Sequence, residues 1–365
     1  MYRQPKPRRH PLSALNTLPL IDAVLWSYRL FLGRDPEDMT ALVQHLDGQP
    51  SLNDIRLKFL QSNEFINYLA SSKQSCVSPA MLAAFPAYNG PGVEGFFTDF
   101  LGTRTRCSYL PPYYAAASGV VEGPPGTERF GLHEPPEWEG TLRSVLEAGS
   151  SFVAVELGAG WGPWLVAGAR AAQLRGITDI RLAGVEGAIG HYEFLLQHFR
   201  DNGLEPDQHQ LLHAVVGVED GVARFPKLEV PSADWGAEAS YGTDHTSTRR
   251  PEQTIEEFDE VRSVSIGTLL ATLPHVDLLH CDIQGAEGEV LTAASDVLSD
   301  RVRRIVVGTH GRAIEDQLMA SFGANGWALE HESPCRFIQS STGALVLSAD
   351  GTQVWRNAGF STAVG

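Results

Sequence analysis

From residue 138 onward, the chain alternates short apolar runs with segments of helical spacing. Strands are predicted at 151–157 (SFVAVEL), 180–186, 210–217, 276–282 and 302–307, with helices between them. Such alternation predicts a parallel sheet covered by helices on both faces. Two last strands, near 327–332 and 344–348, have no helix between them and predict an antiparallel edge. We therefore expect an α/β fold with a doubly wound, mostly parallel, seven-stranded, Rossmann-like sheet.

The first part of the chain predicts a different organisation. Residues 1–18 form a basic tail, and 19–72 a small all-α domain whose helices begin near Leu20, Ser51 and Ser62, the third carrying Phe65, Ile66 and Leu69. The segments YRLFLGRDPED and FLQSNEF resemble a short helical domain attached to bacterial enzymes and surface proteins. That resemblance implies a module for protein docking or spacing. Residues 73–95 are expected to be a linker, and 96–137 an irregular, lid-like segment leading into the domain 138–365.

Charge and cysteine usage narrow the classes of function. The 365 residues carry 28 basic and 44 acidic side chains, a net charge of −16, which argues against a nucleic-acid partner. No run of 18 apolar residues predicts a membrane span, and no secretion signal opens the chain. The four cysteines form no CxxC pair, which argues against a zinc ribbon and fits the reducing cytoplasm.

A glycine-rich turn follows the first strand of the α/β region. It reads Glu156-Leu157-Gly158-Ala159-Gly160-Trp161-Gly162-Pro163. Ligands of such sheets bind beyond the carboxyl ends of the strands. A dinucleotide motif would place its third glycine at 163, where this chain has proline, and Glu156 would repel a pyrophosphate. An acidic residue before the glycines suits a ligand that carries an ammonium and a sulfonium.

A second acidic residue ends the next predicted strand. Glu186, followed by Gly187, lies 28 residues beyond Gly158. A carboxylate at this place can accept hydrogen bonds from both hydroxyls of a ribose. We therefore expect a cofactor site made of the residues Glu156, Gly158, Ala159, Gly160, Trp161, Gly162, Glu186 and Gly187.

These motifs resemble those of S-adenosylmethionine-dependent methyltransferases with a class I fold. Over residues 96–365, the segments AVVGVEDGVARF, VDLLHCDIQGAEGEVL and RRIVVGTHGRAIEDQL further resemble the FkbM family of O-methyltransferases. The resemblance implies S-adenosylmethionine as cofactor and methyl transfer to a hydroxyl of a glycan, a glycoside or a sugar-containing natural product. The family has carboxylates where this chain has Gln284 and Gly308. Their absence leaves a divalent metal as a weakly supported second cofactor, and we assign no residue as a metal ligand.

Two polar residues follow the adjacent predicted strands four and five. His310 suits a general base because its ordinary pKa of about 6.5 exceeds the value of about 3.9 for aspartate. Asp282 could orient that imidazole, bind the acceptor hydroxyl, or be the base itself. Asp282 and His310 are our candidate catalytic residues.

The acceptor site is predicted from aromatic side chains and one histidine in irregular segments. His133, Trp235 and Tyr241 are the candidates, although each also fits a surface loop. The acceptor is expected to be a neutral small molecule or glycan, because the acidic chain would repel a polyanion. Two other functions stay open: a dinucleotide-dependent oxidoreductase, and a cofactor-binding scaffold without activity.

Overall fold

A computed structural model describes residues 20–31, 35–36, 38–46, 50–60, 62, 77–241, 257–340 and 343–360. The chain divides into two compact units, residues 1–74 and 75–365. The predicted basic tail and the helix expected to carry Phe65, Ile66 and Leu69 lie outside the described residues. Among the residues described, every helix is too short or too polar to cross a bilayer.

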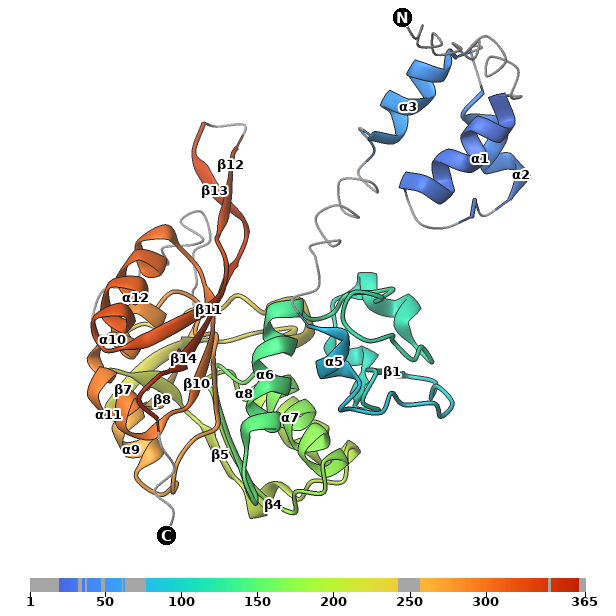
Figure 1. The fold of residues 1–365 in the computed structure, drawn as a ribbon. Helices are drawn as coiled ribbons and strands as arrows, with labels where there is room; N and C mark the ends of the chain where they lie inside the picture. Colours follow the sequence, from blue (N-terminus) through green and yellow to red (C-terminus); the bar gives the residue numbers. More distant parts are fainter. Residues whose placement is uncertain are drawn as a thin grey trace, which may run out of the picture. The chain divides into compact units, whose positions relative to one another are not determined.

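The described part of the first unit is helical. It contains α1 (Leu20–Phe31), α2 (Met39–Gln44) and α3 (Leu52–Leu60) (Figure 1). Ser51 and Asp54 form a capping box at the start of α3, because each accepts a hydrogen bond from the other's backbone N–H. The described core of this unit is made of Val24, Tyr28, Leu42, Ile55 and Phe59.

The second unit is built on a seven-stranded sheet in the order β11-β14-β10-β9-β3-β4-β5. Its strands are β3 (Ser151–Leu157), β4 (Asp179–Glu186), β5 (Gln210–His213), β9 (Leu278–Cys281), β10 (Arg304–Thr309), β11 (Trp327–Ser333) and β14 (Gly351–Asn357). The five strands from β5 to β10 are parallel, and β14 is antiparallel to both β10 and β11. This confirms the doubly wound fold. The chain order reverses between β3 and β9, which is where such sheets bind ligands.

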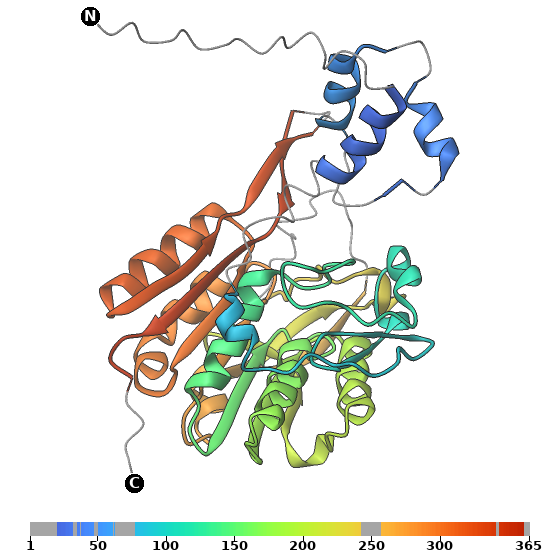
Figure 2. The same ribbon diagram turned by 45° about the vertical axis from the view of Figure 1, so that its right-hand side comes forward.

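Helices cover both faces of this sheet (Figures 1 and 2). Along β3, Phe152 and Ala154 pack into one core, and Val153 and Val155 into the other, because side chains of a strand alternate between its faces. The first core includes residues of α6 (Pro135–Glu147), α7 (Pro163–Leu174) and α8 (Ile189–Asp201). The second includes residues of α9 (Ile266–Leu270), α10 (Glu287–Ala293), α11 (Ser295–Arg301) and α12 (Arg312–Ala324).

Two predicted strands are corrected by the sheet topology. The run 210–217 breaks at Ala214: β5 stays in the main sheet, while β6 (Val215–Gly217) joins a small sheet with β7 (Gly221–Pro226) and β8 (Phe258–Ser265). The run 344–348 corresponds to β13 (Leu345–Ala349), which pairs only with β12 (Arg336–Gln339) in a hairpin. The seventh strand of the main sheet is β14, whose central residues are buried on both faces.

The expected linker 73–95 is also corrected over its described part. Val77, Met81 and Phe85 around α5 (Pro79–Leu82) are buried in the first core, so this stretch belongs to the second unit. The segment 96–137 contains the short pair β1 (Phe96–Thr98) and β2 (Arg104–Arg106), and two 3-10 helices, Cys107–Tyr109 and Pro112–Ala117, joined by irregular backbone. It also enters α6 at Pro135, and Leu132 and His133 face the cavity described below.

Candidate functional site

A cavity of about 470 Å³ opens beyond the carboxyl ends of β3, β4 and β9. Its volume is in the range of small-molecule sites. The chain reversal of the sheet and the cavity therefore coincide. All eight residues predicted to bind the cofactor except Gly162 line this cavity, as do Asp282, His133, Trp235 and Tyr241.

The glycine turn between β3 and α7 has the backbone geometry that its sequence predicts. Gly158 and Gly160 have φ angles of 71° and 55°, in the left-handed region that favours glycine. A Cβ at residue 158 would lie 1.9 Å from the backbone oxygen of Asp282, so the turn packs directly against the end of β9. Pro163 occupies the first turn of α7, where its missing N–H costs nothing.

Glu186 links the end of β4 to this turn. Its Oε2 accepts a hydrogen bond from the N–H of Gly160 at 2.8 Å, and its Oε1 accepts one from Ala188 at 2.7 Å. The side chain is buried but lines the cavity. Each carboxylate oxygen keeps a further acceptor site for a ligand hydroxyl.

Glu156 has a structural role that its sequence did not predict. Its carboxylate accepts hydrogen bonds from the N–H groups of Trp164 and Leu165, and so satisfies the first turn of α7. Burial raises the pKa of Glu156 to about 8. His280, on the neighbouring strand β9, lies opposite Glu156 in the sheet. Nε2 of His280 lies within hydrogen-bond distance of Oε1 of Glu137, at 3.1 Å.

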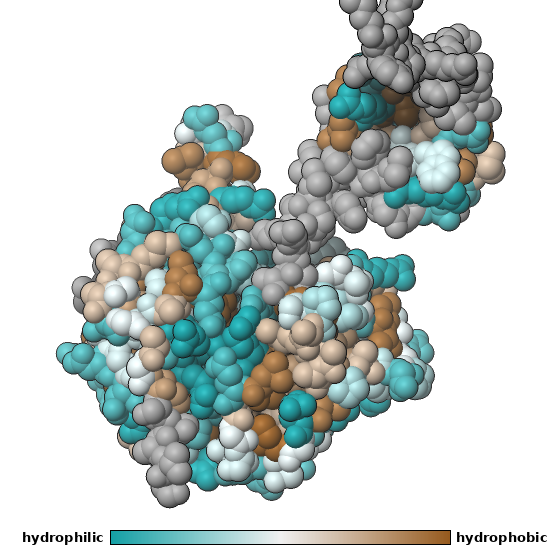
Figure 3. Space-filling model, viewed as in Figure 1, coloured by the Kyte–Doolittle hydropathy of each residue, from teal (hydrophilic) through white to brown (hydrophobic). Residues whose placement is uncertain are grey.

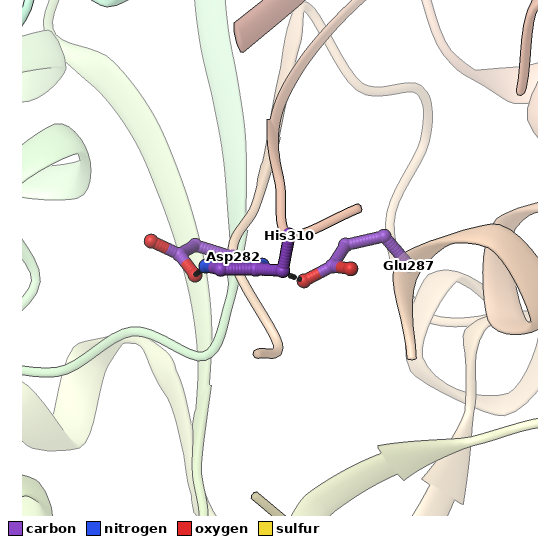
Figure 4. A group of neighbouring side chains, drawn as sticks. All are labelled: Asp282, Glu287 and His310. Atoms are coloured by element: carbon purple, nitrogen blue, oxygen red, sulfur yellow. Dashed lines mark hydrogen bonds and ion pairs between the residues drawn. The ribbon is translucent and has the colours of Figure 1, made fainter. Parts of the chain in front are cut away.

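Asp282, His310 and Glu287 form a chain of contacts, with the imidazole between the two carboxylates (Figure 4). Nε2 of His310 lies 3.3 Å from Oδ1 of Asp282, and Nδ1 lies 2.7 Å from Oε1 of Glu287. Glu287 also accepts hydrogen bonds from the N–H groups of Ile283 and Gly285, so it is held by its own loop. The two predicted catalytic residues are thus brought together.

The two differ in how they meet the cavity. The side chain of Asp282 is 39% exposed and lines the cavity, whereas that of His310 is 1% exposed and lies behind it. Burial raises the pKa of Asp282, and the nearby His310 partly opposes that shift. This geometry favours Asp282 as the group that meets a ligand, and His310 as the residue that positions it.

The possible ligand atoms of Asp282, Glu287 and His310 lie within 4.8 Å of one another, close enough to hold one cation. Glu287 has both oxygens engaged by backbone N–H groups, and His310 Nδ1 faces Glu287. A Cβ at residue 308 would lie 3.4 Å from the Asp282 carboxylate, so a carboxylate there would have completed an oxygen-rich site, but this chain has glycine. The donors that remain are a poor match for a hard divalent cation, and we derive no chemical step through a metal.

The three predicted acceptor residues lie at the cavity in different settings. Trp235 stacks on His191 with ring centroids 4.0 Å apart, and its edge meets Trp161. The hydroxyl of Tyr241 donates a hydrogen bond to the backbone oxygen of Val216, and the residue is 42% exposed. His133 packs on Trp164 at 4.8 Å, and burial lowers its pKa to about 4, so it is neutral at pH 7.

Several titratable residues near the cavity were missed from the sequence, and four of them bear on the candidate site. They are Glu137, His280, Glu287 and Asp350. Glu287 lies five residues after Asp282 in the segment DIQGAEGE, and that spacing was a usable signal. Glu137 precedes the first strand of the main sheet, and its proximity to His280 depends on how α6 packs, which no local pattern reveals.

Comparison with known proteins finds a relative that matches most of this chain. No protein-family model matches the sequence. A protein of Jannaschia sp. (strain CCS1), named "Putative methyltransferase", is 33% identical over 273 residues, which are 75% of this chain and 96% of that protein.

Solved structures resemble the chain more distantly. Precorrin-6y C5,15-methyltransferase from Geobacter metallireducens GS-15 is 11% identical with a TM-score of 0.34, over 62% of this chain and 88% of that one. Ribosomal protein L11 methylase from Lactobacillus delbrueckii subsp. bulgaricus is 10% identical with a TM-score of 0.31, over 68% of this chain and 88% of that one.

Proposed function

This chain belongs to the methyltransferase family, and on that premise we propose that it is an S-adenosylmethionine-dependent O-methyltransferase. The acceptor is a hydroxyl of a glycan, a glycoside or a sugar-containing natural product. One observation carries the cofactor assignment: Glu186 hydrogen-bonds to Gly160, so a ribose-binding carboxylate and the glycine turn form one wall of the cavity. The narrower resemblance to the FkbM family stays a prediction.

The cofactor would lie along the carboxyl ends of β3 and β4. Gly158, Ala159, Gly160 and Trp161 leave the backbone open to its amino-acid end, while Gly162 allows the turn into α7. Glu186 and Gly187 would meet the ribose. When bound, S-adenosylmethionine supplies an already activated methyl group. The residues of the chain need only align an acceptor oxygen and take its proton.

Asp282 is the proposed general base. Its carboxylate faces the cavity, and desolvation by the surrounding protein raises its pKa, which makes it a stronger proton acceptor than an aspartate in bulk water. Gln284 donates a hydrogen bond to Oδ1 at 2.6 Å, and His310 stands 3.3 Å from the same oxygen. These contacts hold the carboxylate of Asp282 in place. Its Oδ2 takes the proton of the acceptor hydroxyl as the oxygen of that hydroxyl attacks the methyl group.

The acceptor would lie against the aromatic side of the cavity. Trp235 and Tyr241 border this side of the cavity, and Trp161 of the glycine turn contacts Trp235. Aromatic faces stack on the apolar faces of sugar rings, and the neutral ring of His133 adds one donor and one acceptor. These features support an uncharged, hydroxyl-rich acceptor. That nucleic acid is not the acceptor stays a prediction from the net charge.

The helical first unit is proposed to dock on another protein. Apolar residues lie on the surface of this unit (Figure 3), and Trp26, Met39 and Val43 are at least half exposed, which supports a docking role. We also expect the protein to work in the cytoplasm, since Cys107, Cys281 and Cys335 are free thiols.

A transfer assay tests this function. The protein is incubated with S-adenosylmethionine labelled in its methyl group and a panel of glycosides, free sugars, RNA and protein. We expect label on a glycoside hydroxyl, and transfer slower by about 100-fold or more with Asp282→Asn. Label only on RNA or protein would overturn the acceptor class. Cofactor binding without transfer to any acceptor would favour the scaffold, and binding of a nicotinamide dinucleotide instead would favour the oxidoreductase.

A further inference from the structure

A second cavity, of about 210 Å³, lies between α7, the end of α8 and β2, and shares no lining residue with the cavity of the candidate site. Val166, Ala169 and Leu204 are buried and give this second cavity an apolar floor. Its volume is below the usual range for sites of drug-sized molecules. It therefore has room for a ligand of only a few carbon atoms.

Two arginines line the second cavity from different elements. Arg104 comes from β2 and Arg170 from α7. Nε of Arg170 donates a hydrogen bond to the backbone oxygen of Leu101 at 3.0 Å. Within the part of the chain that the structure describes, the Nη atoms of Arg170 and the guanidinium of Arg104 have no hydrogen-bond or ion-pair partner. These donors are available to a ligand in the cavity.

The other polar groups of the wall leave the charge of the two arginines uncompensated. Asp201 lines the cavity, but Arg106 donates to its two carboxylate oxygens at 2.6 and 2.8 Å, so this pair is neutral. The side-chain amide of Asn202 bonds to the backbone N–H and oxygen of Arg104, at 2.8 and 3.0 Å, and so holds the start of β2 at the cavity. The wall keeps two positive charges in a chain whose net charge is −16.

We propose that this second cavity binds a small organic anion, with a carboxylate or phosphate head at Arg104 and Arg170 and a short hydrocarbon body on the apolar floor. Guanidinium groups present planar pairs of N–H donors that match the oxygens of either head. The apolar floor favours a ligand with a hydrocarbon body over an inorganic ion. The site is separate from the proposed methyl transfer and does not depend on it.

Calorimetry on the full chain, at constant ionic strength, tests the site with four probes. Butyrate and butyl phosphate have the same body and differ in the head, inorganic phosphate is a head alone, and 1-butanol is a body alone. We expect butyrate or butyl phosphate to bind with a Kd of about 1 mM or below, and the tighter of the two identifies the head. Inorganic phosphate should bind more weakly than butyl phosphate, and 1-butanol should not bind at about 10 mM.

Variants locate the binding. Arg104→Gln and Arg170→Gln should each weaken the tighter probe about 10-fold or more, as the loss of a hydrogen bond between charged groups does. Gln173→Glu should also weaken it, because Gln173 lines the cavity, is exposed, and would bring a negative charge to the anion. Arg175→Gln is the matched control: it removes the same charge at the end of α7, at an exposed position outside the cavity, and should change binding less than about twofold.

Urea unfolding shows which variants are folded. If Arg170→Gln unfolds because its bond to Leu101 is lost, Arg104→Gln and Gln173→Glu still decide the question. The proposal is overturned if neither butyrate nor butyl phosphate saturates the protein by about 10 mM, or if a folded Arg104→Gln binds as tightly as the wild type. Equal weakening by Arg175→Gln would overturn it too, because binding would then follow net charge and not the cavity.

Discussion

Nε2 of His310 lies 3.3 Å from Oδ1 of Asp282, yet only the carboxylate faces the cavity. The imidazole is held on its other side by Glu287, at 2.7 Å. The imidazole of His310 therefore lies between a buried acid, Glu287, and an acid that faces the cavity, Asp282. We propose that Asp282 takes the proton of the acceptor, and that His310 fixes the position and charge of Asp282.

Replacing Asp282 by asparagine should remove the base and keep the shape. We expect Asp282→Asn to lower kcat by about 10²- to 10⁴-fold, the usual contribution of general base catalysis. The affinity for S-adenosylhomocysteine should change little, because the predicted cofactor contacts come from β3 and β4. Turnover is measured with labelled cofactor and affinity by calorimetry. Turnover near that of the wild type would remove Asp282 from the chemistry.

The pH profile tests the positioning role of His310. Asp282 must be ionised to act, and burial raises its pKa, so kcat/KM should fall as the pH drops through that raised value. His310 lowers the pKa of Asp282. His310→Gln should therefore raise it further and move the acidic limb of the profile to higher pH. If that limb stays in place while activity falls, the role of His310 is something other than tuning Asp282.

Much of this site could be predicted from local sequence. The turn 158–162 and the strands β3 and β4 have strong local signals, because glycines and short apolar runs mark them. The strand β14 was missed: its segment GTQVWRN has only two large apolar residues, yet the strand is buried because β10 and β11 flank it, with Val354 in the first core and Trp355 in the second. Glu137 was missed because only the packing of α6 against the sheet brings it to His280.

The glycine turn makes a prediction about stability. Gly158→Ala combines a φ of +71° with a Cβ only 1.9 Å from a backbone oxygen, so it should cost more than about 3 kcal/mol in the free energy of unfolding. Gly176→Ala is the matched control: φ is +79° there, but no atom lies within 4 Å, so only about 1–2 kcal/mol should be lost. Urea unfolding measures both. Equal losses would show that the close approach to Asp282 does not constrain the turn.

Metal removal should leave activity unchanged. The carboxylate of Glu287 accepts hydrogen bonds from backbone N–H groups, and Gly308 has no side-chain oxygen to place beside Asp282. We expect dialysis against EDTA, with and without added Mg²⁺, to change kcat by less than about twofold, because no metal-bound oxygen is needed to activate the acceptor. A loss of activity that Mg²⁺ restores would assign the group Asp282, Glu287 and His310 to a cation instead.

The most direct test of the central claim is a titration of S-adenosylhomocysteine and of NAD into the wild-type protein and Glu186→Gln. Glu186 joins the glycine turn to the proposed ribose site through its hydrogen bond to Gly160. The account predicts that S-adenosylhomocysteine binds, NAD does not, and Glu186→Gln weakens binding about 10- to 100-fold, as the loss of hydrogen bonds to a charged acceptor does. Failure of S-adenosylhomocysteine to bind at millimolar concentration, or equal binding by Glu186→Gln, would contradict it.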